Sequence, residues 1–368
     1  MRIGFDARLM TETGVGRYIK NLLGQYLRLN KDDEFFIFLS PYAFNRFAAP
    51  AKNWHKVKIS VSWHSFSEQL ILPLILLRYR LDLVHFPYFN VPILYPGKYI
   101  ITVHDLIIDH FPTGRASTLP FLFYHLKRIS YRLIMHYALR HASKILAISK
   151  STRREIIDHY GINPEKITVT YDALEEEFIK SKQNYTPRKK YDFDYFLYVG
   201  NAYPHKNLEL LCRAFTDSSI NSKLKLVLAG DDHFFYPRLK KFVGEKKLDD
   251  YIIFAGHCND RSLSELYKSA RGLIIPSLME GFGLPNLEAV YFNCLPIVSD
   301  IPVFREIWGN DLIYFNPRDI KKLKTAMLRL INLTASEKNK ILLKAKLVLK
   351  KFSWQATAAD TLLQYRLV

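Results

Sequence analysis

PSLMEGFGLPNLEAV, residues 276–290, places two glutamates on either side of a tight glycine turn. The apolar run GLIIPS (272–277) leads into it and predicts a buried strand. Pro285 stands where a helix would begin, a position that suits proline because the N–H it lacks would have no partner there. The pattern therefore predicts a strand, a loop that carries Glu280, and a helix with Glu288 in its first turn.

This predicted corner suits an anionic ligand that also carries hydroxyls. Free N–H groups at a helix start bind phosphate, because they add to the positive end of the helix dipole. A carboxylate accepts hydrogen bonds from hydroxyls. A nucleoside diphosphate sugar, with phosphates between a ribose and a hexose, fits both requirements. For either glutamate alone, a solvated or helix-stabilising role is the simpler interpretation, but the whole phrase favours a binding site.

The rest of the chain alternates short apolar runs with helical patterns. Such alternation predicts doubly wound parallel sheets, and ligands bind at the carboxyl ends of their strands. We therefore expect an α/β protein with two Rossmann-like domains that face each other across a cleft. The expected strands are 2–7, 34–40, 56–61, 81–86, 99–105, 144–149 and 166–171, followed by 195–200, 223–230, 251–256, 272–277 and 295–299.

A polar segment without periodicity, 175–194, divides these two sets of strands and is interpreted as a linker. The predicted domains are 1–174 and 195–351. A chain of 368 residues suits two domains of ordinary size. Its longest apolar run, 70–77, is far shorter than the roughly 20 residues of a spanning helix.

The N-terminus does not read as a signal peptide. The three cysteines, Cys212, Cys258 and Cys294, lack metal-ligand spacing. We therefore expect reduced thiols and a cytoplasmic protein.

The chain is basic, with 53 Lys and Arg against 35 Asp and Glu and a net charge of +18. Residues 110–154 contain nine Lys or Arg and no acid. Such a segment attracts anionic lipid, phosphate or a polyanion. The total charge fits an organism with a basic proteome equally well, and the segment could also be a core helix with basic outer residues.

The phrase at 276–290 resembles the signature E-G-F-G-L-P-x-L-E-A of the family-4 retaining glycosyltransferases and matches it residue for residue. The resemblance implies the GT-B fold and a nucleotide-sugar donor. It implies that Glu280 binds hydroxyls of the donor sugar and that Glu288 holds the ribose. The turn between them would face sugar and phosphate through Gly281, Phe282, Gly283, Leu284 and Pro285.

A second match lies in VGNAYPHKNLELL (199–211), where Lys206 stands at the mouth of a predicted helix. Lysine is unfavourable for the helix dipole there but suits a bound diphosphate. It could also be an ordinary surface lysine. Asn201, a candidate donor-binding residue, occupies the place where the family frequently has arginine, which leaves one phosphate contact open; His205 or a basic residue from elsewhere could supply it.

The first half carries weaker matches. In TETGVGRYIKNLL (11–23), Gly14 and Gly16 would face the donor phosphates. Arg17 would neutralise charge there or lie at the surface. The third glycine of G-x-G-x-x-G is absent, because Ile19 occupies its position.

Further candidates follow three other predicted elements. His104 ends the strand 99–105 and by resemblance lies near the donor sugar and the acceptor, although a structural histidine is the alternative. His257 and Cys258 are candidates to contact the nucleobase through backbone groups. The terminal segment 352–368 resembles the family helix that packs back on the first domain.

The expected activity is metal-independent, retaining transfer of a hexose, with His104, Lys206 and Glu280 as catalytic residues. No convincing D-x-D metal motif flanks a strand, and no cofactor is expected. The sequence motifs resemble those of bacterial mannosyltransferases of surface-polysaccharide assembly, so GDP-mannose is favoured over UDP-sugars as the donor.

The expected acceptor is a glycan or a lipid-linked glycan, and residues 110–154 would rest on the inner face of the cytoplasmic membrane. Two other classes stay open. A nicotinamide-dependent dehydrogenase would need the complete glycine motif. A basic nucleic-acid-binding protein would explain the charge but has no use for 276–290, so no nucleic-acid partner is expected.

Overall fold

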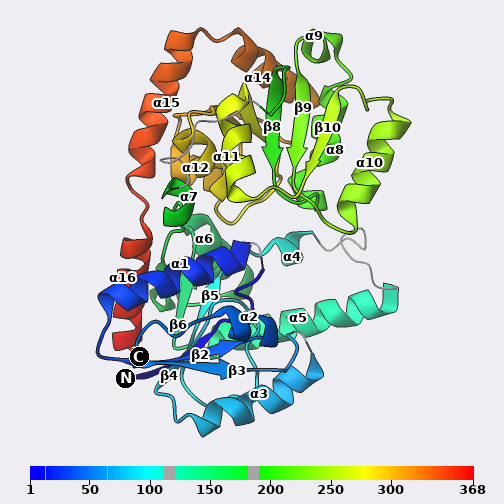
Figure 1. Cartoon of the computed structure of the whole chain (residues 1–368). Coiled ribbons are helices and arrows are strands. Elements are labelled where there is room, and N and C mark those ends of the chain that lie inside the picture. The colour runs from blue at the N-terminus through cyan, green and yellow to red at the C-terminus, as the bar shows by residue number, and fades with distance from the viewer. Residues whose placement is uncertain (13, 64, 112–120, 181–189) are drawn as a thin grey trace. The chain divides into compact units, whose positions relative to one another are not determined.

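The computed structural model describes residues 1–12, 14–63, 65–111, 121–180 and 190–368. Two compact units form the chain (Figure 1). Unit 1 contains the described residues of Met1–Leu106, Leu119–Glu175 and Ser353–Val368. Unit 2 contains those of Ile107–Thr118 and Glu176–Phe352.

Unit 1 is built on a seven-stranded sheet in the order β3-β2-β1-β4-β5-β6-β7, and every strand pair is parallel. The strands β1, β2, β4, β5 and β6 are almost wholly buried, as expected for a parallel sheet covered on both faces, whereas the edge strand β3 exposes His55, Lys56 and Lys58. The strands are β1 (Arg2–Asp6), β2 (Glu34–Leu39), β3 (Trp54–Lys58), β4 (Leu83–Phe86), β5 (Tyr99–Val103), β6 (Lys144–Ala147) and β7 (Ile167–Val169). The helices are α1 (Gly14–Leu29), α2 (Pro41–Arg46), α3 (Phe66–Arg78), α5 (Phe121–His141), α6 (Lys150–Tyr160) and α16 (Trp354–Arg366).

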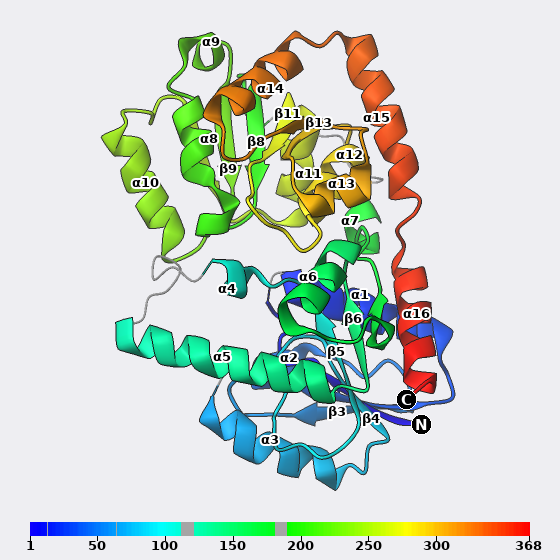
Figure 2. The same ribbon diagram turned by 180° about the vertical axis from the view of Figure 1, so that it is seen from behind.

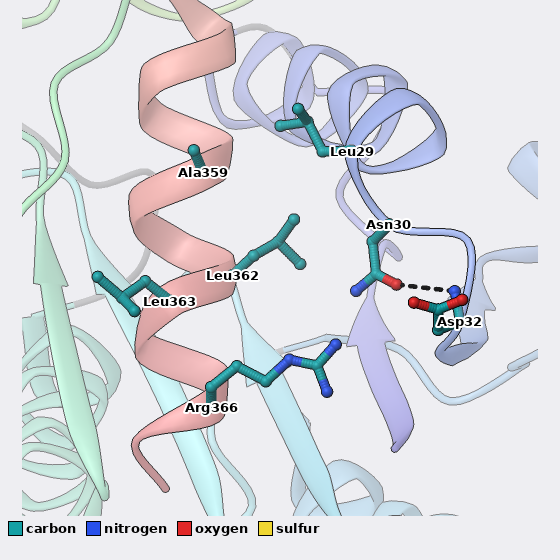
Figure 3. A pocket seen from close by; sticks show the side chains of 7 residues that line it. All are labelled: Leu29, Asn30, Asp32, Ala359, Leu362, Leu363 and Arg366. Atoms are coloured by element: carbon teal, nitrogen blue, oxygen red, sulfur yellow. Dashed lines mark hydrogen bonds between the residues drawn. The ribbon is translucent and has the colours of Figure 1, made fainter.

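The last helix, α16, packs against α1 in unit 1 and crosses it (Figure 2). In the buried contact between the two helices, the hydroxyls of Tyr26 and Tyr365 form a hydrogen bond of 2.8 Å. At the end of this contact Arg366 forms an ion pair of 2.7 Å with Asp33. An open hollow of about 310 Å³ follows this contact (Figure 3), lined by Leu29, Asn30, Asp32, Ala359, Leu362, Leu363 and Arg366. It lies where α1 ends, and therefore at the edge of the sheet opposite to the carboxyl ends of the strands.

Unit 2 is built on a six-stranded parallel sheet in the order β10-β9-β8-β11-β12-β13. The strands are β8 (Tyr195–Val199), β9 (Lys225–Ala229), β10 (Ile252–Gly256), β11 (Gly272–Ile275), β12 (Pro296–Ser299) and β13 (Ile313–Phe315). The helices are α4 (Ile107–His110), α7 (Glu176–Lys180), α8 (Leu208–Ala214), α9 (Ser218–Asn221), α10 (Phe235–Glu245), α11 (Asp260–Ser269), α12 (Leu284–Tyr291), α13 (Pro302–Trp308), α14 (Ile320–Asn332) and α15 (Ala335–Leu349).

The predicted linker begins with ordered structure. Residues 176–180 form α7, and the side chain of Phe178 is buried against the ring of Phe292, with 5.1 Å between ring centroids. This first part therefore packs on unit 2. Residues 181–189 of the predicted linker lie outside the described residues, and its last residues, 190–194, lead directly into β8.

Strand order explains where a ligand would bind in each unit. In unit 2 the chain runs from β8 outward to β10 and then returns to place β11 on the other side of β8. In unit 1 the same reversal separates β1 from β4. The loops that follow the two strands at such a switch point diverge, and ligands of doubly wound folds bind between them.

Candidate functional site

In unit 2 the loops after β8 and β11 are joined at the switch point. The N–H of Leu278 donates to the carbonyl of His205 at 2.7 Å. The amide of Asn207 donates to the carbonyl oxygens of Pro276 and Pro317 at 3.1 and 2.7 Å. Asn207 adopts a left-handed conformation, φ 59°, and ends the short 3-10 turn Pro204–Lys206. These bonds fix the position of Lys206.

Lys206 and Glu280 meet at this junction, as their placement on the two loops allows. The ammonium lies 2.7 and 2.9 Å from the two carboxylate oxygens of Glu280. Ser277 Oγ donates to Glu280 Oε1 at 2.7 Å. The side chains of Lys206 and Glu280 are only 18% and 12% exposed.

The Glu280 carboxylate is stabilised in its charged form despite its partial burial. Burial by itself would raise the pKa of Glu280, but the nearby Lys206 charge and the hydrogen bonds from Lys206 outweigh it and hold that pKa below its ordinary value. An ammonium carries three N–H donors. Lys206 can therefore contact a phosphate oxygen while Glu280 orients it.

The second glutamate of the phrase is more deeply placed. Glu288 is buried, and its Oε2 accepts a hydrogen bond of 2.7 Å from the hydroxyl of Tyr267 on α11. Since α12 begins at Leu284, Glu288 is its fifth residue and lies in the second turn. The prediction of a first-turn position was off by one residue, because the helix begins at Leu284 and not at Pro285. Tyr267 holds this carboxylate, and neither Tyr267 nor Ser277 stood out in the sequence.

The glycine turn depends on Gly283. Gly283 has φ 93°, a backbone conformation that residues with a side chain rarely adopt. A Cβ at this position would lie 2.6 Å from the ring of Phe304. The side chain of Phe282 is buried against Phe352, so only its backbone is available to a ligand. Leu284 and Pro285 start α12 and are half-buried. The neighbouring Gly281 is buried.

Replacing Gly283 by alanine is therefore expected to destabilise unit 2. The strained φ costs about 1 kcal/mol, and the contact with Phe304 adds about 1–3 kcal/mol. Gly161→Ala is the matched control, because Gly161 has φ 63° and nothing within 4 Å of the added Cβ. Thermal unfolding of both variants would measure the effect. Equal behaviour of the two variants would contradict the role given to Gly283.

The residues near the β8 loop differ in what they can supply. Asn201 uses its carbonyl to accept a hydrogen bond of 2.7 Å from the hydroxyl of Tyr198, and its side chain accepts from Tyr203 N at 3.5 Å. His205 is buried, and burial followed by the charge of Lys206 lowers its pKa to about 4. It is therefore neutral near pH 7 and does not supply the charge of the arginine for which it was considered a substitute.

His257 and Cys258 follow β10, the edge strand of the sheet, two positions away from β8. His257 is exposed, and Cys258 is half-buried with its thiol 3.6 Å from the carbonyl of Gly256. The structure thus places them after a different strand from Lys206 and Glu280.

In unit 1, His104 follows β5. Its Nε2 lies 2.9 Å from the carbonyl of Pro87, which makes this nitrogen the donor and leaves Nδ1 as an acceptor. The ring of Tyr18 meets it edge-on at 4.9 Å. Burial lowers the pKa of His104 to about 4, so a neutral imidazole that accepts a hydrogen bond is present at pH 7.

The glycine loop of unit 1 is closely packed at one of its two glycines. A Cβ on Gly16 would lie 2.6 Å from the carbonyl oxygen of Met10, whereas Gly14 has nothing within 4 Å. Gly16 therefore lets α1 approach the loop that follows β1. Arg17 lies 3.5 Å from the carboxylate of Glu175, so it forms an ion pair within unit 1.

Sequence reasoning also missed a buried carboxyl, Asp172, which follows β7. Burial raises its pKa to about 7, far above the ordinary value of 3.8. It lies close enough to Tyr18 for its charge to raise the pKa of that phenol, after the larger effect of burial. A single aspartate outside any motif gives no signal of this kind in sequence.

Asp172→Asn is expected to raise Tm at pH 8 more than at pH 5. The folded carboxyl keeps its proton up to about pH 7 and the unfolded one only to about 3.8, so its stabilising contribution is present below 3.8 and is lost as pH rises through 7. The amide does not ionise and escapes this loss. Thermal unfolding between pH 5 and 8 would measure the difference in Tm between the variant and the natural chain. Asp158→Asn is the control, because the side chain of Asp158 is exposed. A pH-independent difference would contradict the raised pKa.

Two family models match adjoining parts of the chain. One, described as Glycosyltransferase Family 4, matches residues 13–178, and the other, described as Glycosyl transferases group 1, matches residues 180–346.

Among the described residues, no group of three or more His, Cys, Asp or Glu is arranged to hold a metal ion.

Curated relatives and solved structures are similar over most of the chain. The O-antigen chain mannosyltransferase RfbU of Salmonella typhimurium is 29% identical over 266 residues, 72% of this chain and 69% of that protein. The O-antigen chain mannosyltransferase B of Escherichia coli is 27% identical over 278 residues, 73% of this chain and 70% of that protein. The Anabaena HepE structure in complex with UDP and glucose aligns with a TM-score of 0.72 at 15% identity, covering 100% of both chains.

Proposed function

Because this chain belongs to the glycosyltransferases, with a family-4 domain followed by a group-1 domain in a GT-B fold, we propose that it transfers mannose from GDP-mannose to a growing surface polysaccharide. Two relatives named O-antigen chain mannosyltransferases support the sugar and the product class. The dehydrogenase and nucleic-acid-binding interpretations have no support from these comparisons.

The observation that carries the proposal is the pair of Lys206 and Glu280 at the switch point of unit 2. During transfer, negative charge develops on the departing diphosphate, and a fixed cation lowers the barrier by stabilising that charge. Lys206 supplies the cation without a metal ion. Glu280 accepts hydrogen bonds from the sugar hydroxyls and Glu288 from the ribose.

We propose that the reaction retains configuration. The bond between the anomeric carbon and the phosphate oxygen breaks, and the acceptor oxygen forms its bond to that carbon on the same face. The acceptor proton passes to the departing phosphate oxygen. In unit 1, His104 is neutral at pH 7 and would accept a hydrogen bond from an acceptor hydroxyl.

The nucleobase of the donor has two candidates, guanine and uracil. HepE was crystallised with UDP and glucose, which favours a UDP-sugar as the second possibility. A panel of GDP- and UDP-sugars, tested for thermal protection and for slow donor hydrolysis, separates the two. Protection by GDP-mannose above the others is expected. Stabilisation by NAD alone, or by no nucleotide, would contradict the proposed function.

The acceptor is proposed to be a glycan or lipid-linked glycan at the inner face of the cytoplasmic membrane. Among the described residues, no helix has the length and apolar character needed to cross a bilayer. Within the basic segment 110–154, the described part of α5 exposes Leu126, Ile129 and Leu133 alongside Arg132. A basic surface with exposed apolar side chains suits peripheral contact with anionic lipid.

A further inference from the structure

The outer face of α3 in unit 1 is apolar and exposed. Phe66 is 91% exposed, Leu70 and Leu74 are 61%, Leu77 is 49% and Ile71 is 45%. The positions 66, 70, 74 and 77 repeat at helical spacing, so their side chains form one stripe along the helix. We call these five residues the α3 stripe.

The opposite face of α3 already serves the core, since Leu72, Pro73 and Leu76 are buried. A helix that is apolar on all sides is normally buried on all sides. The loop before β5 extends the exposed surface, because Ile93 N donates to the side chain of Gln69 on α3 at 2.8 Å, and Ile93 and Leu94 are themselves exposed. An apolar patch of this kind marks an interaction site.

The charged residues around the α3 stripe favour an anionic partner. Between residues 63 and 81 the only acidic residue is Glu68, which is buried and lies 2.6 Å from the guanidinium of Arg8. The exposed Arg78 and Arg80 stand at the end of α3. A net charge of +18 repels a second copy of the chain and attracts an anionic surface.

We propose that the α3 stripe inserts into the interface of an anionic lipid bilayer. At 13 residues α3 is about 20 Å long, too short to span the bilayer, so it would lie in the plane of the headgroups. The stripe enters the acyl region, and Arg78 and Arg80 stay at the level of the lipid phosphates. This inference rests on the proposed membrane contact of the enzyme and names a surface for it outside residues 110–154.

The test compares two double variants of the full chain on phosphatidylglycerol vesicles. Leu70→Gln with Leu74→Gln is expected to weaken binding about tenfold or more. Leu343→Gln with Leu347→Gln on α15 is the matched control, since those leucines are 66% and 62% exposed. The control is expected to bind like the natural chain. Both variants should keep their Tm and their donor hydrolysis without vesicles, because neither change touches Lys206 or Glu280.

Several outcomes would overturn the proposal. Both double variants could bind the vesicles as well as the natural chain does, or both could lose binding to the same extent. The natural chain could fail to bind anionic vesicles, or it could form a dimer that only the α3 double variant dissociates. Binding to phosphatidylcholine alone would also contradict it, because the charges would then contribute nothing. Loss of donor hydrolysis in the natural chain would instead count against the proposed function and leave the vesicle result intact.

Discussion

Lys206→Ala is expected to lower kcat about a hundredfold or more, the scale of losing a fixed group that stabilises transition-state charge. The ammonium of Lys206 is held at the junction of two loops, 2.7 Å from Glu280. Its removal takes away the cation proposed for the leaving diphosphate. It also leaves the carboxylate of Glu280 partly buried without a counter-charge, which is unfavourable in itself. Steady-state kinetics with the identified donor would measure the loss.

The control for this variant is another lysine paired with a glutamate. Lys241 lies 3.9 Å from Glu245 on α10, with a side chain that is largely exposed. Lys241→Ala is expected to leave kcat unchanged, because an exposed pair of this kind contributes little. A kcat for Lys206→Ala within a few fold of the natural value would remove Lys206 from the mechanism, provided that Tm shows an intact fold.

The corner at 276–290 could be predicted because its signals are local. The apolar run predicted the strand that the structure ends at Ile275, and Pro285 predicted the start of a helix that begins at Leu284. Proline and glycine constrain their own backbone, so such signals do not depend on the rest of the fold. Parallel sheets followed in the same way from the alternation of strands and helices.

The contact between Lys206 and Glu280 could not be predicted from local patterns. The two residues are 74 positions apart, and they meet only because β11 returns to the side of β8. The neutral state of His205 has the same origin, since it arises from burial by the fold around it. Strand β13 has only three residues, too few for a periodic pattern.

The apolar run 70–77 shows a related limit. In the sequence it predicts only a segment too short to span a membrane. The structure divides it, because Leu72 and Leu76 face the core while Leu70 and Leu74 face outward. Periodicity distinguishes an apolar face from a polar one, and α3 has apolar residues on both faces. Which face would lie outside therefore depended on how the rest of unit 1 covers the helix.

Glu280→Ala is expected to reduce kcat by more than about tenfold, the scale of one lost charged hydrogen bond. In the proposed complex its carboxylate orients the sugar by accepting hydrogen bonds from hydroxyls. The KM for the donor is expected to stay level, because the unshared charge of Lys206 holds the diphosphate more strongly and offsets the lost hydroxyl contacts. The defect should therefore appear in kcat, as for an interaction made in the transition state.

Two companions make this prediction specific. Glu280→Gln keeps an acceptor oxygen and should retain more activity than Glu280→Ala if the role is to bind hydroxyls. The double variant with Lys206→Ala should lose less than the product of the two single losses, because directly bonded residues act as a unit. Near-normal turnover of Glu280→Ala, or independent losses in the double variant, would show that the two residues do not act together on the donor.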